Sequence, residues 1–263
     1  MDLLLDRSSK IPYSEKKHLR KQTHLNSVKG SAKLTRLKDD LLTLKNPENT
    51  ATLSRFFKTG KGDYGEDDLF LGITVPEQRK IAKEYHDLSL RDLKMLLSSR
   101  IHEYRLVALL ILTIKYRKAD RTGKQEIAEF YLVNRAGVNN WDLVDLSAAN
   151  ILGEDLLDRE RSILYKMAVS ANLWDRRIAV LSTFAFIKRD QFKDSLAIAE
   201  LLLSDTHDLI HKAVGWMLRE IGKRDLKVEE RFLQRHCRKM PRTMLRYAIE
   251  RFEQDKRKDY LKR

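Results

Sequence analysis

The chain has 263 residues, and its 52 Lys and Arg against 38 Asp and Glu give a formal net charge of +14. With 42% hydrophobic and 34% charged residues, it has neither the composition of a disordered chain nor that of a membrane protein. No apolar run approaches the ~20 residues that a membrane helix needs, and the opening Met1 to Asp6 is too short and too acidic for a secretory signal. We therefore expect a soluble, folded protein of the cytoplasm whose excess positive charge serves nucleic acid.

Turn-forming residues are scarce, with ten glycines and four prolines in the whole chain. Sandwiches and barrels need many tight turns, so the composition favours helices. The single cysteine, Cys237, cannot form an internal disulfide and excludes a Cys-based zinc cluster. This usage is typical of a reducing compartment.

Two regions are expected along the chain. Residues 1–30 are basic with only scattered apolar residues, and they form either a loose basic arm or a solubilising tail. From Ser31 onward apolar residues recur at helical spacing, so residues 31–263 are expected to form one helical domain. Within it, residues 58–76 hold four of the ten glycines and predict a long loop, with Pro76 near the start of the next helix.

That loop does not have the pattern of a phosphate-binding loop. Such a loop follows a strand and ends in Gly-Lys-Ser/Thr, whereas this one ends in the acidic cluster Glu66, Asp67 and Asp68. These carboxylates would repel nucleotide phosphates, so we do not expect nucleotide binding.

The later helices share a register in which a cation precedes a short apolar block. It occurs at Arg105, Arg177, Lys212 and Arg246, with gaps of 72, 35 and 34 residues. A missing member is expected near position 141, where Trp141 opens a segment of the same register. A period near 35 residues built from two helices indicates a repeat array of the HEAT or TPR size class. The predicted fold is an all-α solenoid.

The second helix of each repeat commonly lines the concave surface of such an array. Equivalent positions then form a first ridge of Arg105, Trp141, Arg177, Lys212 and Arg246. One helical turn further, a second ridge contains Leu109, Asp145, Leu181, Trp216 and Glu250. Most members of the first ridge are cations, which predicts a concave, basic groove for a DNA backbone.

Three ridge residues point to chemistry: the carboxylate Asp145 and the indoles Trp141 and Trp216. A carboxylate repels DNA unless a cation offsets it, and indole faces attract cations. DNA alkylated at a purine ring nitrogen carries such a cation. Loss of that base develops positive charge on deoxyribose, which a carboxylate stabilises. The alternative is structural, because acidic residues are favoured in a first helical turn and tryptophans are usually core residues.

Several cations and histidines remain as candidates. Arg177 on the first ridge is interpreted as a phosphate contact or as an ion pair between helices, whereas Arg176 is expected to pair with Asp175 or a neighbouring repeat. Lys212 and Arg219 are expected in the same groove as Trp216. His207 and His211 have metal-ligand spacing, but no third ligand is evident, so solvated histidines and no bound metal are expected.

Four segments in the same order resemble the AlkD-type DNA alkylation-repair glycosylases. They are residues 60–76, with Phe70-Leu71-Gly72-Ile73, and residues 138–145, 173–179 and 212–220. The resemblance runs from about Ser31 to Phe252 and leaves out the basic arm. It implies a HEAT-like fold, and a base excision repair glycosylase that hydrolyses the glycosidic bond of cationic alkylated purines, such as 7-methylguanine and 3-methyladenine. It also implies that the duplex lies in the concave groove without deep base flipping, unlike the usual strategy.

The resemblance also assigns roles by position. It implies that Asp145 is the catalytic aspartate, that Trp141 and Trp216 face the lesion, and that Arg177 contacts phosphate, in a monomer that uses no metal or cofactor and acts on nucleoid DNA. Two rival hypotheses stay open. One is a non-catalytic HEAT-like protein that binds damaged or branched DNA, and the other is a HEAT-type scaffold for an acidic protein partner.

Overall fold

The computed structural model describes residues 30–262, and in this range the regular structure is helical apart from one isolated parallel bridge between Leu69 and Ile101. The predicted all-α fold is confirmed. The arm predicted for residues 1–30 lies outside the described residues except for Gly30. Among the described helices, none combines the length and the apolar character needed to span a membrane.

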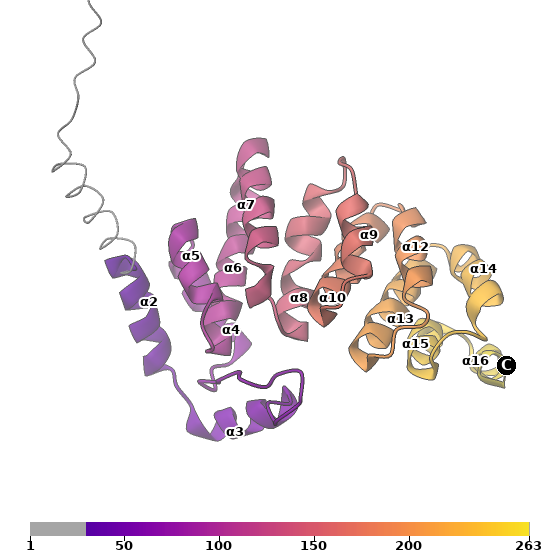
Figure 1. The fold of residues 1–263 in the computed structure, drawn as a ribbon, viewed down its shortest axis with the longest axis horizontal. Helices are drawn as coiled ribbons and strands as arrows, with labels where there is room; N and C mark the ends of the chain where they lie inside the picture. The colour runs from indigo at the N-terminus through magenta and orange to yellow at the C-terminus, as the bar shows by residue number, and fades with distance from the viewer. Residues whose placement is uncertain (1–29, 263) are drawn as a thin grey trace, which may run out of the picture.

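The helices follow one another in a curved stack of two layers (Figure 1). The described part of the chain starts with α2 (Ala32–Thr43), α3 (Pro47–Phe56) and α4 (Val75–Glu84). Consecutive pairs follow: α5 (Leu90–Leu97) and α6 (His102–Lys118), α7 (Arg121–Val133) and α8 (Trp141–Ser147), α9 (Ser162–Ala168) and α10 (Leu173–Ser182), α12 (Lys193–Leu201) and α13 (Asp208–Gly222), α14 (Leu226–His236) and α15 (Arg242–Ala248). The remaining elements are η1 (Arg135–Gly137), η2 (Ala149–Gly153), α11 (Phe184–Ile187), η3 (Ile249–Arg251) and α16 (Gln254–Lys262).

The second helices of the pairs pack against one another in chain order. α6 contacts α8, α8 contacts α10, α10 contacts α13, and α13 contacts α15. Each of these five helices contains one position of the predicted register: Arg105, Trp141, Arg177, Lys212 and Arg246. The repeat of about 35 residues is therefore confirmed.

Helix starts follow from their capping residues. The Ser31 hydroxyl accepts a hydrogen bond from the backbone of Leu34 at the start of α2, and Thr74 forms a capping box with Glu77 at the start of α4. Asn140 accepts from the backbone N–H of Trp141, so α8 begins at Trp141 as predicted.

Two members of the predicted second ridge, Leu109 and Leu181, belong to the hydrophobic core. Leu109 is fully buried and Leu181 is nearly so, and both pack in the continuous apolar core. The prediction that the whole ridge lines a groove is therefore wrong at these two positions. Apolar side chains gain about 1.5–3 kcal/mol each from leaving water, so they turn inward even where polar residues in the same register do not.

Glu103 on α6 anchors the long loop between α3 and α4. It is 1% exposed, and its Oε1 accepts hydrogen bonds from the backbone N–H groups of Leu71 and Gly72, both at 2.9 Å. Gly72 has φ +85°, and a Cβ there would overlap the backbone carbonyl of Asn46. Only glycine fits this close approach. The loop is thereby fixed against the helices that carry the candidate site.

Candidate functional site

Asp145 on α8 and Arg177 on α10 form a bidentate ion pair. Arg177 donates from Nε to Asp145 Oδ1 at 2.9 Å and from Nη2 to Oδ2 at 2.8 Å. The Asp145 side chain is 21% exposed, whereas that of Arg177 is 6% exposed. The pair therefore presents its negative end to the surface and keeps its positive end inside. Because each carboxylate oxygen has a second lone pair, Asp145 can still accept a hydrogen bond from a molecule outside.

The protonation of Asp145 follows from its surroundings. Burial raises the pKa of its carboxyl above the ordinary value of 3.8, and the Arg177 guanidinium opposes that rise. Two donated hydrogen bonds require a carboxylate as acceptor, so the geometry fits the ionised form.

Arg177 holds three successive repeats together. Besides its two bonds to Asp145, its Nη1 donates to the backbone carbonyl of Leu209 in α13 at 2.6 Å. Of the two interpretations offered by the sequence, the structure shows the ion pair between helices, and the guanidinium is not a free phosphate clamp. The pair also removes the argument that Asp145 needs a cationic substrate group to offset its charge, because Arg177 supplies that charge from within the protein.

Arg105 departs from the predicted cationic ridge in the same way. It is 2% exposed, and its Nη2 donates to Asp68 at 2.6 Å. The prediction that Arg105 lines a phosphate groove is wrong, because this guanidinium neutralises a buried carboxylate.

Trp141 lies at the first position of α8, one turn before Asp145, and is partly exposed. Its indole stacks on Phe57, with ring centroids 5.3 Å apart and an interplanar angle of 19°, and meets Phe56 edge to face at 5.8 Å. The rings of the α3 end thus cover one face of the indole and set its orientation. Of the two phenylalanines, Phe56 is 61% exposed.

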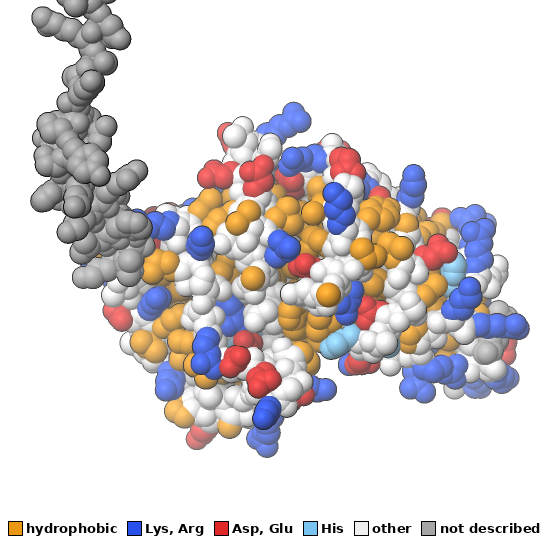
Figure 2. Space-filling model, in the orientation of Figure 1, with side chains coloured by type: hydrophobic (Ala, Val, Ile, Leu, Met, Phe, Trp, Pro, Cys, Tyr) orange, Lys and Arg blue, Asp and Glu red, His pale blue; other side chains and the backbone are white. Residues whose placement is uncertain are grey.

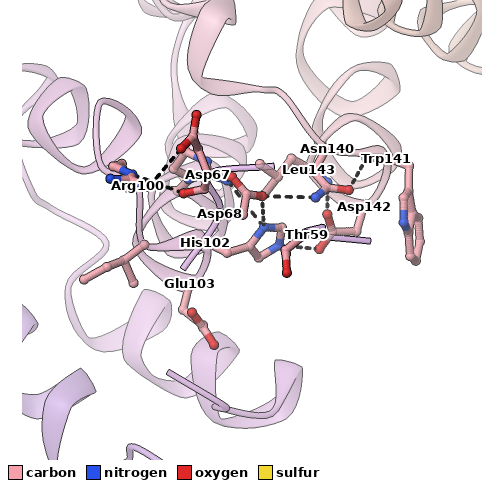
Figure 3. A network of polar contacts seen from close by, with 12 residues as sticks. Thr59, Asp67, Asp68, Arg100, His102, Glu103, Asn140, Trp141, Asp142 and Leu143 are labelled. Carbon is pink, nitrogen blue, oxygen red and sulfur yellow. Dashed lines mark hydrogen bonds and ion pairs between the residues drawn. The ribbon is translucent and has the colours of Figure 1, made fainter. Parts of the chain in front are cut away.

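A buried polar network supports the start of α8 (Figure 3). His102 on α6 contacts Asp142 through Nε2 at 2.8 Å and Asp68 through Nδ1 at 3.3 Å. The Asn140 side chain donates to Asp68 at 3.1 Å while its oxygen caps Trp141. Asp68, from the long loop, therefore fixes the capping residue of the helix that carries Trp141 and Asp145.

The charges in this network follow from the contacts. Burial lowers the pKa of His102, but the hydrogen bonds to Asp142 and Asp68 outweigh it and leave the pKa above the ordinary 6.5. Burial raises the pKa of Asp68, and the bonds from His102, Arg105 and Asn140 bring it below the ordinary 3.8. These directions favour the protonated form of His102 and the ionised form of Asp68.

Trp216 and its neighbours on α13 are half-buried. The Trp216 indole N–H donates to Glu220 at 3.1 Å, and the ring packs against Phe184 at 5.9 Å.

Lys212, one turn before Trp216, pairs with Asp208 at 2.7 Å and remains 40% exposed. Arg219 pairs with Glu250 and is 20% exposed. Leu209, which accepts from Arg177, lies two turns before Trp216, so the Asp145 pair and Trp216 share one side of α13.

The remaining candidates have structural partners. Arg176 pairs with Asp205 of the neighbouring repeat at 2.7 Å, which confirms one of its two predicted partners. The ring of His207 accepts from the Leu209 backbone at the start of α13, and His211 contacts the carbonyl of Asp205. Between residues 30 and 262, no group of three or more His, Cys, Asp or Glu is arranged to hold a metal ion.

Sequence reasoning missed the buried network. The sequence places Asp68 in an acidic cluster that would repel phosphates, whereas in the structure it is 7% exposed and pairs with Arg105. Two sequence features could have indicated it: the apolar run that follows Asp68, which predicts burial of this part of the loop, and the position of Asn140 directly before a helix, which is typical of a capping residue. His102 gave no local signal, because its partners lie 34 and 40 residues away.

Exposed cations gather at the α14–α16 end of the molecule (Figure 2). They include Arg231, Arg235, Arg238, Lys239, Arg242 and Arg246. Of the cations on the first ridge, Arg246 and the half-buried Lys212 are accessible, whereas Arg105 and Arg177 are not. The accessible cations of the first ridge therefore lie beyond the Asp145 pair, toward the C-terminal repeats.

The fold and this site define a helical-repeat protein whose second helices bring a carboxylate and aromatic rings together. A family model described as DNA alkylation repair enzyme matches residues 37–252, and the chain belongs to that family. The predicted membership is confirmed. No curated protein matches the chain.

Solved structures with the same fold share little sequence with this chain. A "Predicted DNA alkylation repair enzyme" from Enterococcus faecalis has a TM-score of 0.63 at 19% identity, over 80% of this chain and 97% of that chain. The protein smu.31 from Streptococcus mutans UA159 has a TM-score of 0.50 at 18% identity, over 78% and 98%. AlkD2 from Streptococcus mutans has a TM-score of 0.49 at 18% identity, over 84% and 97%. At these identities the likeness to the first two structures establishes the fold alone.

Proposed function

We propose that this protein is a DNA glycosylase that hydrolyses the glycosidic bond of cationic alkylated purines, such as 7-methylguanine and 3-methyladenine, in duplex DNA. One observation carries the proposal. Asp145 is a half-buried carboxylate held by two hydrogen bonds from Arg177, with its negative end at the surface and an oriented indole one turn away.

The proposed reaction uses the charge of the substrate. The bond between C1′ and the purine nitrogen breaks, and its electron pair leaves with the base, which becomes neutral. Positive charge develops on the deoxyribose, and water adds to C1′ and loses a proton. Asp145 stabilises the developing charge and accepts a hydrogen bond from the water. Because the leaving base is already cationic, no general acid and no cofactor are required.

The neighbouring residues are assigned to binding. Trp141 and Trp216 offer half-buried indole surfaces to the lesion nucleotide. Lys212 and Arg219, both partly exposed, are assigned to backbone phosphates, together with the exposed cations of the C-terminal repeats. Arg177 is assigned to hold Asp145 in place, and we propose that the protein acts as a monomer on nucleoid DNA.

The test replaces Asp145 by asparagine. Asp145→Asn keeps the shape of the side chain and removes its charge, so release of 7-methylguanine from methylated duplex should fall by about 100-fold or more. The matched control is Asp205→Asn, because Asp205 also pairs with an arginine of α10, at 2.7 Å. Its base release should match that of the parent. Mass spectrometry of the released bases also identifies the adducts that are accepted.

The non-catalytic alternative is favoured by one observation, which is that Arg177 already neutralises Asp145. If the pair only holds repeats together, both asparagine variants lose stability, and the parent retards damaged DNA without releasing a base. Parental base release by Asp145→Asn would refute the proposed mechanism.

A salt titration separates DNA binding from a scaffold for an acidic protein. Several phosphate contacts cost about 10³-fold or more in affinity between about 50 and 200 mM salt. A flat response for duplex DNA would favour the scaffold hypothesis.

A further inference from the structure

Tyr64 lies at the tip of the long loop between α3 and α4, and its position is fixed. Its neighbours Lys61, Gly62 and Asp63 are exposed, whereas Tyr64 is half-buried. The backbone N–H of Gly65 donates to the carbonyl of Lys58 at 3.1 Å, and a Cβ on Gly65 would overlap the backbone of Phe57. The loop therefore holds the phenol in one direction.

That direction is toward the candidate site. The ring of Tyr64 meets the indole of Trp174 edge to face, with centroids 5.9 Å apart and an interplanar angle of 76°. Its hydroxyl accepts a hydrogen bond from the Trp141 indole, and the charge of Lys212 acts on it. Tyr64 of the long loop thus interacts with residues of three successive repeats, Trp141, Trp174 and Lys212.

The chain contains three tryptophans, Trp141, Trp174 and Trp216. All three are partly exposed and lie on second helices, and Tyr64 contacts two of them. Trp141 has one face covered by Phe57. Because Tyr64 and Trp174 meet edge to face, one ring covers a single face of the other, and each ring keeps at least one face free of its partner. This pair continues the aromatic surface from Trp141 toward Lys212.

We propose that Tyr64 and Trp174 form a second aromatic subsite that takes an unstacked nucleobase at the lesion. The inference rests on the proposed function, because its ligand is a damaged duplex. A base has a π-face that stacks on an aromatic side chain whatever its sequence. Lys212 is 40% exposed and near enough for its charge to act on Tyr64, so it is the cation assigned to the phosphate of the same nucleotide.

The experiment measures equilibrium binding to three duplexes. One is undamaged, one carries a tetrahydrofuran abasic analogue, and one carries 7-methylguanine on a 2′-fluorinated deoxyribose that resists cleavage. The proteins are the parent, Tyr64→Ala and Tyr64→Phe. Tyr64→Ala should weaken binding of damaged duplex by about tenfold and leave binding of undamaged duplex within about twofold. Tyr64→Phe should bind like the parent, because it keeps the ring.

The two damaged duplexes identify which base is bound. The abasic analogue lacks the lesion base, so weaker binding of both damaged duplexes assigns the subsite to the base opposite the lesion. Weaker binding of the fluorinated duplex alone assigns it to the alkylated base.

Three outcomes overturn the inference. Tyr64→Ala could bind damaged duplex like the parent, or the parent could fail to prefer damaged duplex. In the third, Tyr64→Phe weakens binding as much as Tyr64→Ala, which shows that the hydroxyl acts only by orienting Trp141. Because binding is measured without turnover, a parent that binds damaged duplex but releases no base refutes the proposed function and leaves this inference standing.

Discussion

The carboxylate of Asp145 and the guanidinium of Arg177 are joined by two parallel hydrogen bonds, although the residues lie 32 positions apart. They belong to second helices of consecutive repeats, α8 and α10, which pack against each other. A planar guanidinium fits a carboxylate in this way and lysine does not. The pair therefore fixes both the position and the direction of the carboxylate, which is what stabilisation of a developing charge requires.

Replacing Arg177 by lysine tests this positioning. Arg177→Lys keeps the positive charge but loses the paired geometry and the bond to Leu209, so base release should fall by about tenfold or more. Arg176→Lys is the matched control, because Arg176 is the adjacent residue of α10 and also bonds one carboxylate and backbone carbonyls. Both variants should lose about 1–3 kcal/mol in urea unfolding. Equal base release by the two variants would contradict a positioning role for Arg177.

The pH dependence of base release should have an acidic limb set by Asp145. Burial raises the pKa of this carboxyl, and the ionised form is the active one, so activity is lost as pH falls through the raised value. The rate should be measured from about pH 8 to about pH 4, after subtraction of spontaneous base loss. Arg177→Lys should move the limb to higher pH, because the carboxylate loses its best donor. A limb that does not move would show that another group titrates.

His102 should make stability depend on pH. Its folded pKa is raised above 6.5, so it contributes stability that is present below that value and is lost as pH rises through the folded pKa. His102→Gln should cost about 1–3 kcal/mol at about pH 6, and the difference from the parent should shrink toward about pH 9. Urea unfolding at both pH values measures this. A constant difference would indicate that folding does not raise the pKa of His102.

Gly72 and Gly62 form a matched pair for backbone constraint. Both have positive φ, +85° and +82°. A Cβ on Gly72 would overlap the Asn46 carbonyl, whereas a Cβ on Gly62 would have no atom within 4 Å. Gly62→Ala should therefore cost about 1 kcal/mol for its conformation alone. Gly72→Ala should cost several kcal/mol, because it also disturbs the donors that Glu103 accepts from. Similar unfolding midpoints for the two variants would exclude the clash.

The repeat and the helix starts could be predicted because they depend on local pattern. The spacing of Arg105, Arg177, Lys212 and Arg246 predicts the second helices and places the missing member at Trp141, where α8 begins. Which side chains face outward could not be predicted in this way.

Asp145 and Leu109 illustrate the missing information. They share a register position, yet Leu109 is fully buried and Asp145 reaches the surface. The difference depends on packing between repeats, and so do the partners of Arg177, His102 and Asp68. Contacts between residues more than 30 positions apart leave no trace in local periodicity.

Arg177 touches three repeats at once, through Asp145 on α8 and Leu209 on α13. Arg177 thus links three repeats near the middle of the solenoid, and the carboxylate proposed as catalytic is one of the groups that it holds. A change in the curvature of the superhelix at this point would shift the carboxylate of Asp145. On the proposed function, duplexes of different bend should therefore differ in the rate of base release as well as in affinity.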